Sequence, residues 1–342
     1  MINKNSHWND NNKCHYNAPF LLKPVGKDYL WGGRRLNDDF AKNIDLQPLA
    51  ETWECSTHKD GMSVVSSGEF IGKTLKEVLE IHPEYVGSHP KTRGDIPILV
   101  KFIDAKQDLS VQVHPDDQYA FKYEKGQLGK SEMWYVLDAE KDAKIVYGLH
   151  QDVNREHFQQ MLERGQAEKY LLKVPVKDND VFFIEAGTIH AIGAGLLIAE
   201  IQEKSNLTYR LYDYNRIDKS GKKRELHISK GLDVANLKAI AEPTQPMRVL
   251  QYEPGCAKEL LCRCQYFQVE RLLLNTERNR NMVTYYSNSL SFKILLCING
   301  CGSIFWGDNK ALSFFKGDCI FVPAESEKLK IHGKAQFLSI SC

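Results

Sequence analysis

The sequence lacks a hydrophobic run long enough to cross a membrane, and its first 16 residues are polar and rich in asparagine, unlike a signal peptide. It also lacks an excess of either charge, since 45 Lys and Arg face 44 Asp and Glu among 342 residues. A chain without a strong overall field does not attract nucleic acid or a membrane surface by net charge. We therefore expect that the protein binds neither nucleic acid nor a membrane. We also expect a cytoplasmic location and a ligand that is recognised at a local site. The sequence carries no pattern that specifies an oligomeric state.

Cysteine pairs with the spacing of a zinc finger are also missing. The nine cysteines are an odd, scattered set, and without a secretion signal they favour free thiols in a reducing compartment. The alternative to free thiols is a second metal site, formed by Cys262 with Cys264 and by Cys297 with Cys301. Small thiols buried along a strand are the simpler interpretation.

What the sequence does contain is mostly short apolar segments of strand length. Two stretches have apolar residues at helical spacing instead: residues 74–83, which end at a proline, and residues 154–172, where Asn154 is a suitable N-cap. Residues 239–248 contain two prolines and break both periodicities. The pattern predicts a mainly β chain with a few helices and a domain boundary in that region.

Four side chains that can bind metals stand on or next to segments with the pattern of strands: Gln112, His114, Glu132 and His190. Gln112 and His114 are two apart, so a strand directs both to the same face. Two imidazoles, a carboxylate and an amide oxygen suit Zn²⁺ or another first-row divalent ion. A closed structural zinc site would be favoured by nearby cysteines, and none lies close in sequence. We expect an open position for substrate or water. For each histidine taken alone, an ordinary surface or core position is the alternative.

The chain also contains an internal match. Residues 316–324 align with residues 178–186, and in this alignment Lys328 stands at the position of His190. A lysine is protonated at neutral pH and repels a metal ion. Residues 289–307 have the pattern of a hairpin with its turn near Gly300, without a counterpart of the Gln112 and His114 pair. We infer a second β-domain without a metal, with chance similarity of two strand-turn segments as the alternative.

The ordered motifs carry a resemblance that covers residues 20–235. They are LSVQVHPD at 109–116, GKSE at 129–132, AGTIHAI at 186–192, Tyr209 followed by Arg210, YLWGG at 29–33 and ETWE at 51–54. The set resembles type I mannose-6-phosphate isomerase in its short bacterial form. The resemblance implies a mainly β fold of two cupin-type (jelly-roll) β-barrels with a few covering helices. It divides the chain into a polar N-terminal tail (1–20), a catalytic metal-binding cupin domain (21–240) and a metal-free cupin-like domain (241–342).

The resemblance also implies the chemistry, which is the interconversion of mannose 6-phosphate and fructose 6-phosphate through a metal-stabilised enediolate. One Zn²⁺ per chain, or another first-row divalent ion, would be held by Gln112, His114, Glu132 and His190. Arg210 matches the active-site arginine of the family, and Lys130 matches a lysine with an acid–base or substrate-binding role. The implied phosphate contacts are Lys101, Ser110 and Arg216. An acidic residue of the long form is replaced by Asn206, so ring opening needs another group here.

Two other classes of protein stay open, since a cupin fold hosts many functions. A metal-dependent dioxygenase needs two histidines and a carboxylate, which this ligand set contains once Gln112 is left out. The pairing of Gln112 with His114, and of Lys130 with Glu132, speaks against that class. A sugar-phosphate sensor without catalysis is the second alternative, for which intact metal ligands would be superfluous.

Overall fold

The computed structural model describes residues 17–89, 94–217, 221–277 and 281–342. Most of the predicted N-terminal tail therefore lies outside the described residues. The strands of the described residues form three antiparallel sheets. The first has the order β10 (Val181–Ile184), β7 (Glu132–Ala139), β12 (Leu196–Glu203), β5 (Ile98–Ala105), β3 (Glu51–Cys55) and β2 (Val25–Lys27). The second has the order β13 (Tyr209–Tyr212), β6 (Val111–Val113), β11 (His190–Ile192), β8 (Lys144–Leu149) and β9 (Leu171–Pro175).

The third sheet contains ten strands. Its main path is β14 (Gln251–Glu253), β15 (Cys256–Arg263), β16 (Gln268–Asn275), β21 (Leu329–Ser341), β18 (Lys293–Trp306), β20 (Cys319–Val322), β1 (Phe20–Lys23) and β4 (Val64–Val65), while β17 (Val283–Tyr285) pairs with β21 and β19 (Lys310–Phe315) with β18. The mainly β class predicted from the sequence is confirmed.

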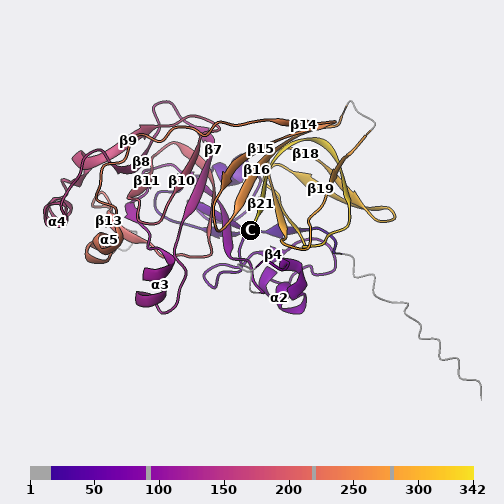
Figure 1. Cartoon of the computed structure of the whole chain (residues 1–342), viewed down its shortest axis with the longest axis horizontal. Coiled ribbons are helices and arrows are strands. Elements are labelled where there is room, and N and C mark those ends of the chain that lie inside the picture. The colour runs from indigo at the N-terminus through magenta and orange to yellow at the C-terminus, as the bar shows by residue number, and fades with distance from the viewer. Residues whose placement is uncertain (1–16, 90–93, 218–220, 278–280) are drawn as a thin grey trace, which may run out of the picture.

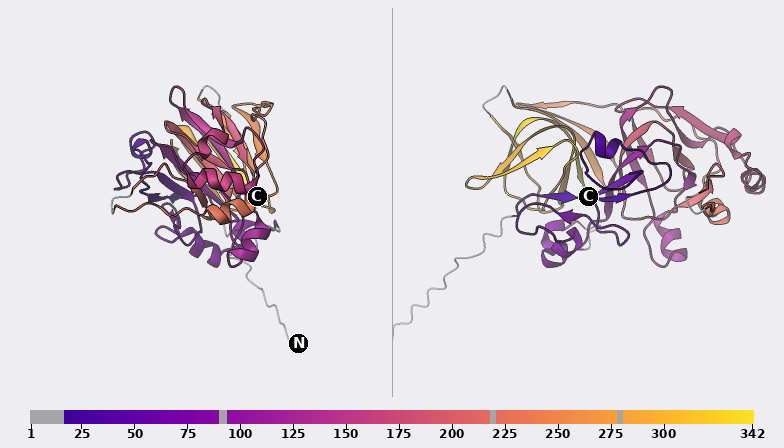
Figure 2. Two further views of the ribbon diagram at one scale, coloured as in Figure 1. Left: turned by 90° about the vertical axis from the view of Figure 1, so that its left-hand side faces the viewer. Right: turned by 180° about the vertical axis from the view of Figure 1, so that it is seen from behind.

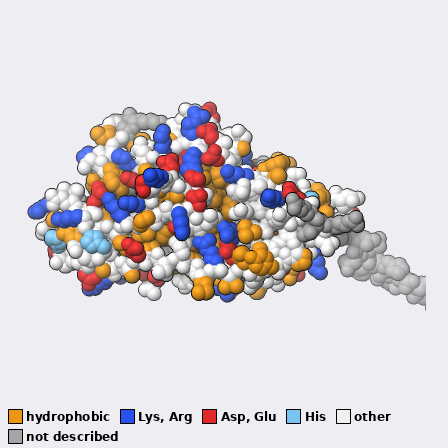
Figure 3. Space-filling view, turned by 90° about the horizontal axis from the view of Figure 1, so that it is seen from above, with side chains coloured by type: hydrophobic (Ala, Val, Ile, Leu, Met, Phe, Trp, Pro, Cys, Tyr) orange, Lys and Arg blue, Asp and Glu red, His pale blue; other side chains and the backbone are white. Residues whose placement is uncertain are grey.

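Two lobes lie side by side (Figure 1), and the same division is seen from behind in the right-hand view of Figure 2. One lobe holds the six- and five-stranded sheets, and the other holds the C-terminal strands. Acidic and basic side chains are mixed over the face seen from above (Figure 3), as expected for a near-neutral chain. Within the described residues, every helix is too short or too polar to cross a membrane.

The predicted domain division cuts across the sheet pairing. β1 and β4, which belong to the predicted catalytic domain, hydrogen bond within the C-terminal sheet, where Phe20 lies opposite Phe321. One core cluster also spans both lobes, since Leu197 and Ala199 of β12 share it with Leu338 of β21. β12 is buried along its whole length, so its two faces contact two different cores.

Both predicted helical stretches contain a helix. α2 (Leu75–Ile81) begins with a capping box between Thr74 and Glu77. α4 (Arg155–Glu163) is capped by Asn154 as expected, but it ends near Gly165 and is followed by a short 3-10 helix (Ala167–Tyr170) and by β9. The remaining helices were not predicted: α1 (Arg35–Asp38), α3 (Asp117–Tyr123), α5 (Ile228–Val234) and a 3-10 helix (Pro83–Val86).

The internal match corresponds to equivalent local structure. β10 begins at residue 181 and β20 at residue 319, which is 138 positions later. Two positions before each strand stands a residue with positive φ, Asn179 before β10 and Gly317 before β20. The predicted hairpin at 289–307 is wrong, because β18 runs through it as one strand. Gly300 has φ of +84° and stands next to a bulge in the pairing of β18 with β21, so the turn signal marks an irregularity inside a long strand.

Candidate active site

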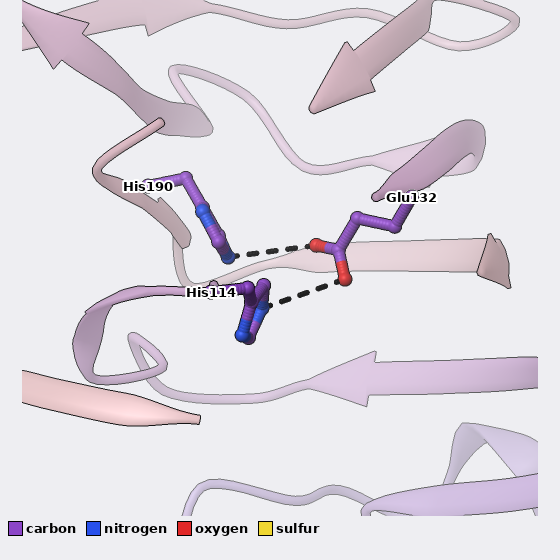
Figure 4. A group of neighbouring side chains, drawn as sticks. All are labelled: His114, Glu132 and His190. Carbon is purple, nitrogen blue, oxygen red and sulfur yellow. Dashed lines mark ion pairs between the residues drawn. The ribbon is translucent and has the colours of Figure 1, made fainter. Parts of the chain in front are cut away.

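A buried cluster of His114, Glu132 and His190 is the one group of three or more potential metal-binding side chains within the described ranges. Their donor atoms all lie within 4.8 Å of one another. Nε2 of His114 is 3.6 Å from Oε2 of Glu132, and Nε2 of His190 is 3.5 Å from Oε1 of the same carboxylate (Figure 4). The residues come from the end of β6 and the starts of β7 and β11, so both sheets of the first lobe contribute.

The second ring nitrogen of each histidine is held by the backbone. Nδ1 of His114 donates to the carbonyl of Leu207 at 2.7 Å, and Nδ1 of His190 donates to the carbonyl of Thr188 at 2.8 Å. With the proton on Nδ1, the neutral ring directs its Nε2 lone pair to the centre. Burial lowers the pKa of His190 to about 4, and burial with the nearby Lys130 lowers the pKa of His114 well below its usual value. Both rings are therefore neutral at pH 7, which is the form that binds metals.

The centre is built to receive positive charge. The ammonium of Lys130 lies 3.0 Å from Nε2 of His114 and donates to Oε2 of Glu132. Oε1 of Glu132 is buried and has no hydrogen-bond partner in the described part of the chain. Burial and the nearby Glu200 raise the pKa of Glu132 to about 7. A buried carboxylate oxygen without a donor, facing two imidazole lone pairs, fits a divalent cation.

Gln112, the fourth predicted ligand, lies beside this cluster. Its Nε2 is 3.4 Å from Nε2 of His190, and its Oε1 accepts a hydrogen bond of 3.4 Å from Ser110. An amide ligates a metal through its oxygen, so ligation by Gln112 requires the amide to be turned over from this arrangement.

Sheet register explains why these residues meet. In the five-stranded sheet, Gln112 lies opposite His190 on one side and Arg210 on the other. In the six-stranded sheet, Glu200 of β12 lies opposite Lys101 of β5. Directly paired residues of neighbouring strands have their side chains on the same face. Each sheet therefore presents a row of functional side chains to the space between the two.

A cavity of about 230 Å³ adjoins the cluster, because Gln112 and Lys130 contact the cluster and also line the cavity. Its lining includes five of the predicted site residues, which are Lys101, Ser110, Gln112, Lys130 and Arg210.

Arg216 is the one predicted site residue that belongs neither to this lining nor to the buried cluster. Its guanidinium forms an ion pair with Asp213 and donates to the backbone carbonyl of Asp108. The structure therefore does not bring Arg216 together with the other predicted residues.

The charges beside the cluster are densely paired. The Lys101 ammonium is 3.0 Å from Glu200 and 3.7 Å from Glu51, and all three side chains are buried. Burial alone would raise the pKa of Glu200, but the ammonium groups of Lys101 and Lys130 lower this pKa to about 2. With Glu132, the group holds two lysines and three glutamates, so it has a formal charge of −1 that a divalent ion would bring to +1.

Several cavity residues were missed by the sequence reasoning. Glu200 stands on a strand that is otherwise mostly apolar, and an acidic residue in such a run is a signal that could have found it. Tyr29 and Glu51 lie in two of the segments that carried the resemblance, without a role being assigned to them. Arg224 lies in a loop without periodicity, and no sequence signal pointed to it.

Fold and donor cluster together define a cupin-type protein with a centre suited to a divalent metal ion. The protein-family model of the phosphomannose isomerase type I catalytic domain matches residues 20–145 of the sequence. The family model of the mannose-6-phosphate isomerase cupin domain matches residues 257–341. A mannose-6-phosphate isomerase of Bacillus subtilis is 39% identical over 319 residues, which is 93% of this chain and 97% of that protein. The chain belongs to the type I phosphomannose isomerase family.

Further relatives agree with this assignment. A mannose-6-phosphate isomerase of Streptococcus mutans is 39% identical over 73% of this chain and 77% of its own length. The crystal structure of the mannose 6-phosphate isomerase from Bacillus subtilis superposes with a TM-score of 0.84 at 33% identity, covering 95% of this chain and 99% of that one. A phosphomannose isomerase variant from Salmonella typhimurium, at 15% identity and a TM-score of 0.74, covers 94% of this chain and 98% of its own and shows the shared fold.

Proposed function

We propose that this chain interconverts mannose 6-phosphate and fructose 6-phosphate with a bound divalent metal ion, for which Zn²⁺ is the first candidate. The observation that carries the proposal is the buried cluster of His114, Glu132 and His190 beside a polar cavity. The names of the relatives from Bacillus subtilis and Streptococcus mutans support the choice of substrate. The cytoplasmic location expected from the sequence stays a prediction.

Gln112, His114, Glu132 and His190 would hold the ion. When bound, it supplies Lewis-acid polarisation of the substrate oxygens, which favours the negative charge that develops as a proton moves between C1 and C2. The backbone carbonyls behind both histidines keep the rings oriented and neutral. Because Glu132 is the one ligand with a negative charge, the centre keeps a net positive charge.

We assign the proton transfer to Lys130 and charge stabilisation to Arg210. Lys130 is 4% exposed, lines the cavity and contacts His114 and Glu132, so it can exchange a proton with a substrate held beside the donor cluster. Arg210 lines the same cavity, and an arginine stays protonated at neutral pH even where burial lowers its pKa.

The predicted phosphate contacts differ in their support. Lys101 and Ser110 line the cavity and remain proposed contacts, although Lys101 is already paired with Glu200 and Glu51. Arg216 lies outside this lining and remains a prediction without support from the geometry. Ring opening is left to a group other than Asn206, whose amide has no ionisable proton.

The test measures fructose 6-phosphate formation from mannose 6-phosphate before chelation, after chelation and after zinc is restored, together with the metal content per chain. His190→Ala should lose both activity and bound metal. His150→Ala is the matched control, because this imidazole is exposed and its hydrogen bond within the described structure goes to the carbonyl of Lys169. Absence of turnover in fully metal-loaded protein would overturn the proposal.

A further inference from the structure

Arg224 is a cation of the cavity for which the proposed mechanism has no use. It follows β13 in the chain, lines the cavity, and keeps 22% of its side-chain surface exposed. Its Nε donates to Oδ2 of Asp213 at 2.8 Å, and its Nη2 donates to Oδ1 of the same carboxylate. Within the described residues no hydrogen bond is found for Nη1. The carboxylate therefore fixes one edge of the guanidinium and leaves the other edge available.

Arg216 and Arg224 share this single carboxylate. Asp213 is 5% exposed and accepts hydrogen bonds from both guanidinium groups, so two positive charges face one negative charge. The remaining Nη1 of Arg216 donates to the carbonyl of Asp108, and neither residue lines the cavity. Asp213, Arg216 and Arg224 together carry one excess positive charge, and Arg224 is the member of this group that lines the cavity.

Arg210 adds a second cation to the same wall. Its Nη1 donates to the carbonyl of Glu225, which adjoins Arg224, while its Nε is buried without a hydrogen-bond partner in the described structure. Burial and then repulsion from Arg224 lower the pKa of Arg210, which is consistent with two guanidinium groups that lie close together. Among the described residues, Arg210 forms no ion pair with a carboxylate. An anion bound at the free edge of Arg224 would relieve this repulsion.

The carboxylates that line the cavity do not serve as this anion. Glu51 and Glu200 stand on strands of the six-stranded sheet and pair there with Lys101. Arg210 stands on β13, the edge strand of the other sheet, and Arg224 on the loop that follows. The cavity therefore has one wall with balanced charges and another with uncompensated positive charge.

We propose that Arg224 binds the phosphate of the substrate, while Arg210 keeps the charge-stabilising role assigned above. The inference rests on the proposed function, because it takes a sugar phosphate as the ligand. Arg210 lies opposite Gln112 in the sheet and contacts the loop of Arg224 on its other side, so Arg224 is the more remote of the two from the metal-binding cluster. A phosphate on C6 is likewise remote from the reacting C1 and C2. A guanidinium fixed by a carboxylate at one edge can give its free edge to a phosphate oxygen.

The test compares Arg224→Gln with Arg216→Gln, because both changes remove one hydrogen-bonding partner from Asp213. Arg224→Gln should raise KM for mannose 6-phosphate roughly tenfold or more, as expected for the loss of a charge-assisted contact, with a smaller effect on kcat. Arg224→Lys keeps the charge and should recover part of the loss. Arg155→Gln, at an exposed ion pair with Asp233, should leave KM unchanged.

Direct binding separates this inference from the proposed function. Inorganic phosphate and mannose 6-phosphate are titrated calorimetrically into folded, metal-loaded protein, with the thermal midpoint checking that each variant is intact. Phosphate binding that is lost in Arg224→Gln and kept in Arg216→Gln supports the inference even if the wild-type protein shows no turnover. Equal loss in both variants, or loss only in Arg216→Gln, would overturn it. So would unchanged binding and KM in Arg224→Gln beside an active wild-type enzyme.

Discussion

Replacing Lys101 by methionine should strongly destabilise the metal-free protein. The Lys101 ammonium lies 3.0 Å from Glu200 and 3.7 Å from Glu51, and its side chain is 5% exposed. Methionine preserves most of the apolar stem but leaves three buried glutamates, including Glu132, with Lys130 as their lysine partner. Breaking a buried ion pair by removing one partner costs roughly 3–5 kcal/mol, because the remaining charge is still desolvated.

The measurement is urea unfolding of chelator-treated protein, followed by tryptophan fluorescence. Lys173→Met is the matched control, because Lys173 pairs with Glu168 at 3.1 Å with both side chains largely exposed, and such pairs contribute about 0–1 kcal/mol. The double variant Lys101→Met with Glu200→Gln should be more stable than Lys101→Met alone, since it removes one uncompensated carboxylate. A loss of stability for Lys101→Met no larger than that of Lys173→Met would refute the reasoning.

Three further predictions concern stability. Burial and then Asp117 raise the pKa of Glu203 from 4.5 to about 8. Between these two pH values the folded chain binds more protons than the unfolded chain, so the free energy of unfolding falls as pH rises. Glu203→Gln should flatten the pH profile of the unfolding midpoint, and an unchanged slope would contradict this prediction. Gly300→Ala should cost roughly 2 kcal/mol or more, since φ is +84° and the new Cβ would lie 2.1 Å from the carbonyl oxygen of Lys334; Gly221→Ala, with φ of +80° and open space, should cost less in the same denaturant titration. Thr74→Ala should cost about 1 kcal/mol by removing the cap of α2, and no shift of the thermal midpoint would count against the capping box.

Local pattern was sufficient to predict where Gln112, His114 and His190 stand relative to strands and turns. Gln112 and His114 are two apart at the end of a strand, and His190 follows a glycine turn that the structure contains at Gly187, with φ of +91°. Alternation and turn chemistry depend on a few neighbouring residues, so one sequence reveals them. The clustering of these residues with Glu132 was inferred from the resemblance.

Features that depend on distant partners were not predicted. The Asn-Gly signal at Gly300 was taken for a hairpin turn, whereas pairing with β21 on one side keeps β18 continuous through it. Glu200 is placed opposite Lys101 by the pairing of β12 with β5, and the guanidinium of Arg224 is oriented by Asp213, 11 residues away. Helix α3 begins at Asp117, directly after its N-cap Asp116, in a segment that the sequence indicated only as a turn. Register across strands and the path of a loop are long-range properties that periodicity does not encode.

The insertion of β1 into the C-terminal sheet has a consequence for how the protein is made. Phe20 finds its partner in Phe321, which the ribosome adds 301 residues later, so β1, the first strand among the described residues, must wait for nearly the whole chain. Closing so long a loop is entropically costly, and until then the apolar face of β1 has no final binding partner. The second lobe is therefore not an appendage that could be removed by shortening the gene, because each lobe needs residues from the opposite end of the chain before it is finished.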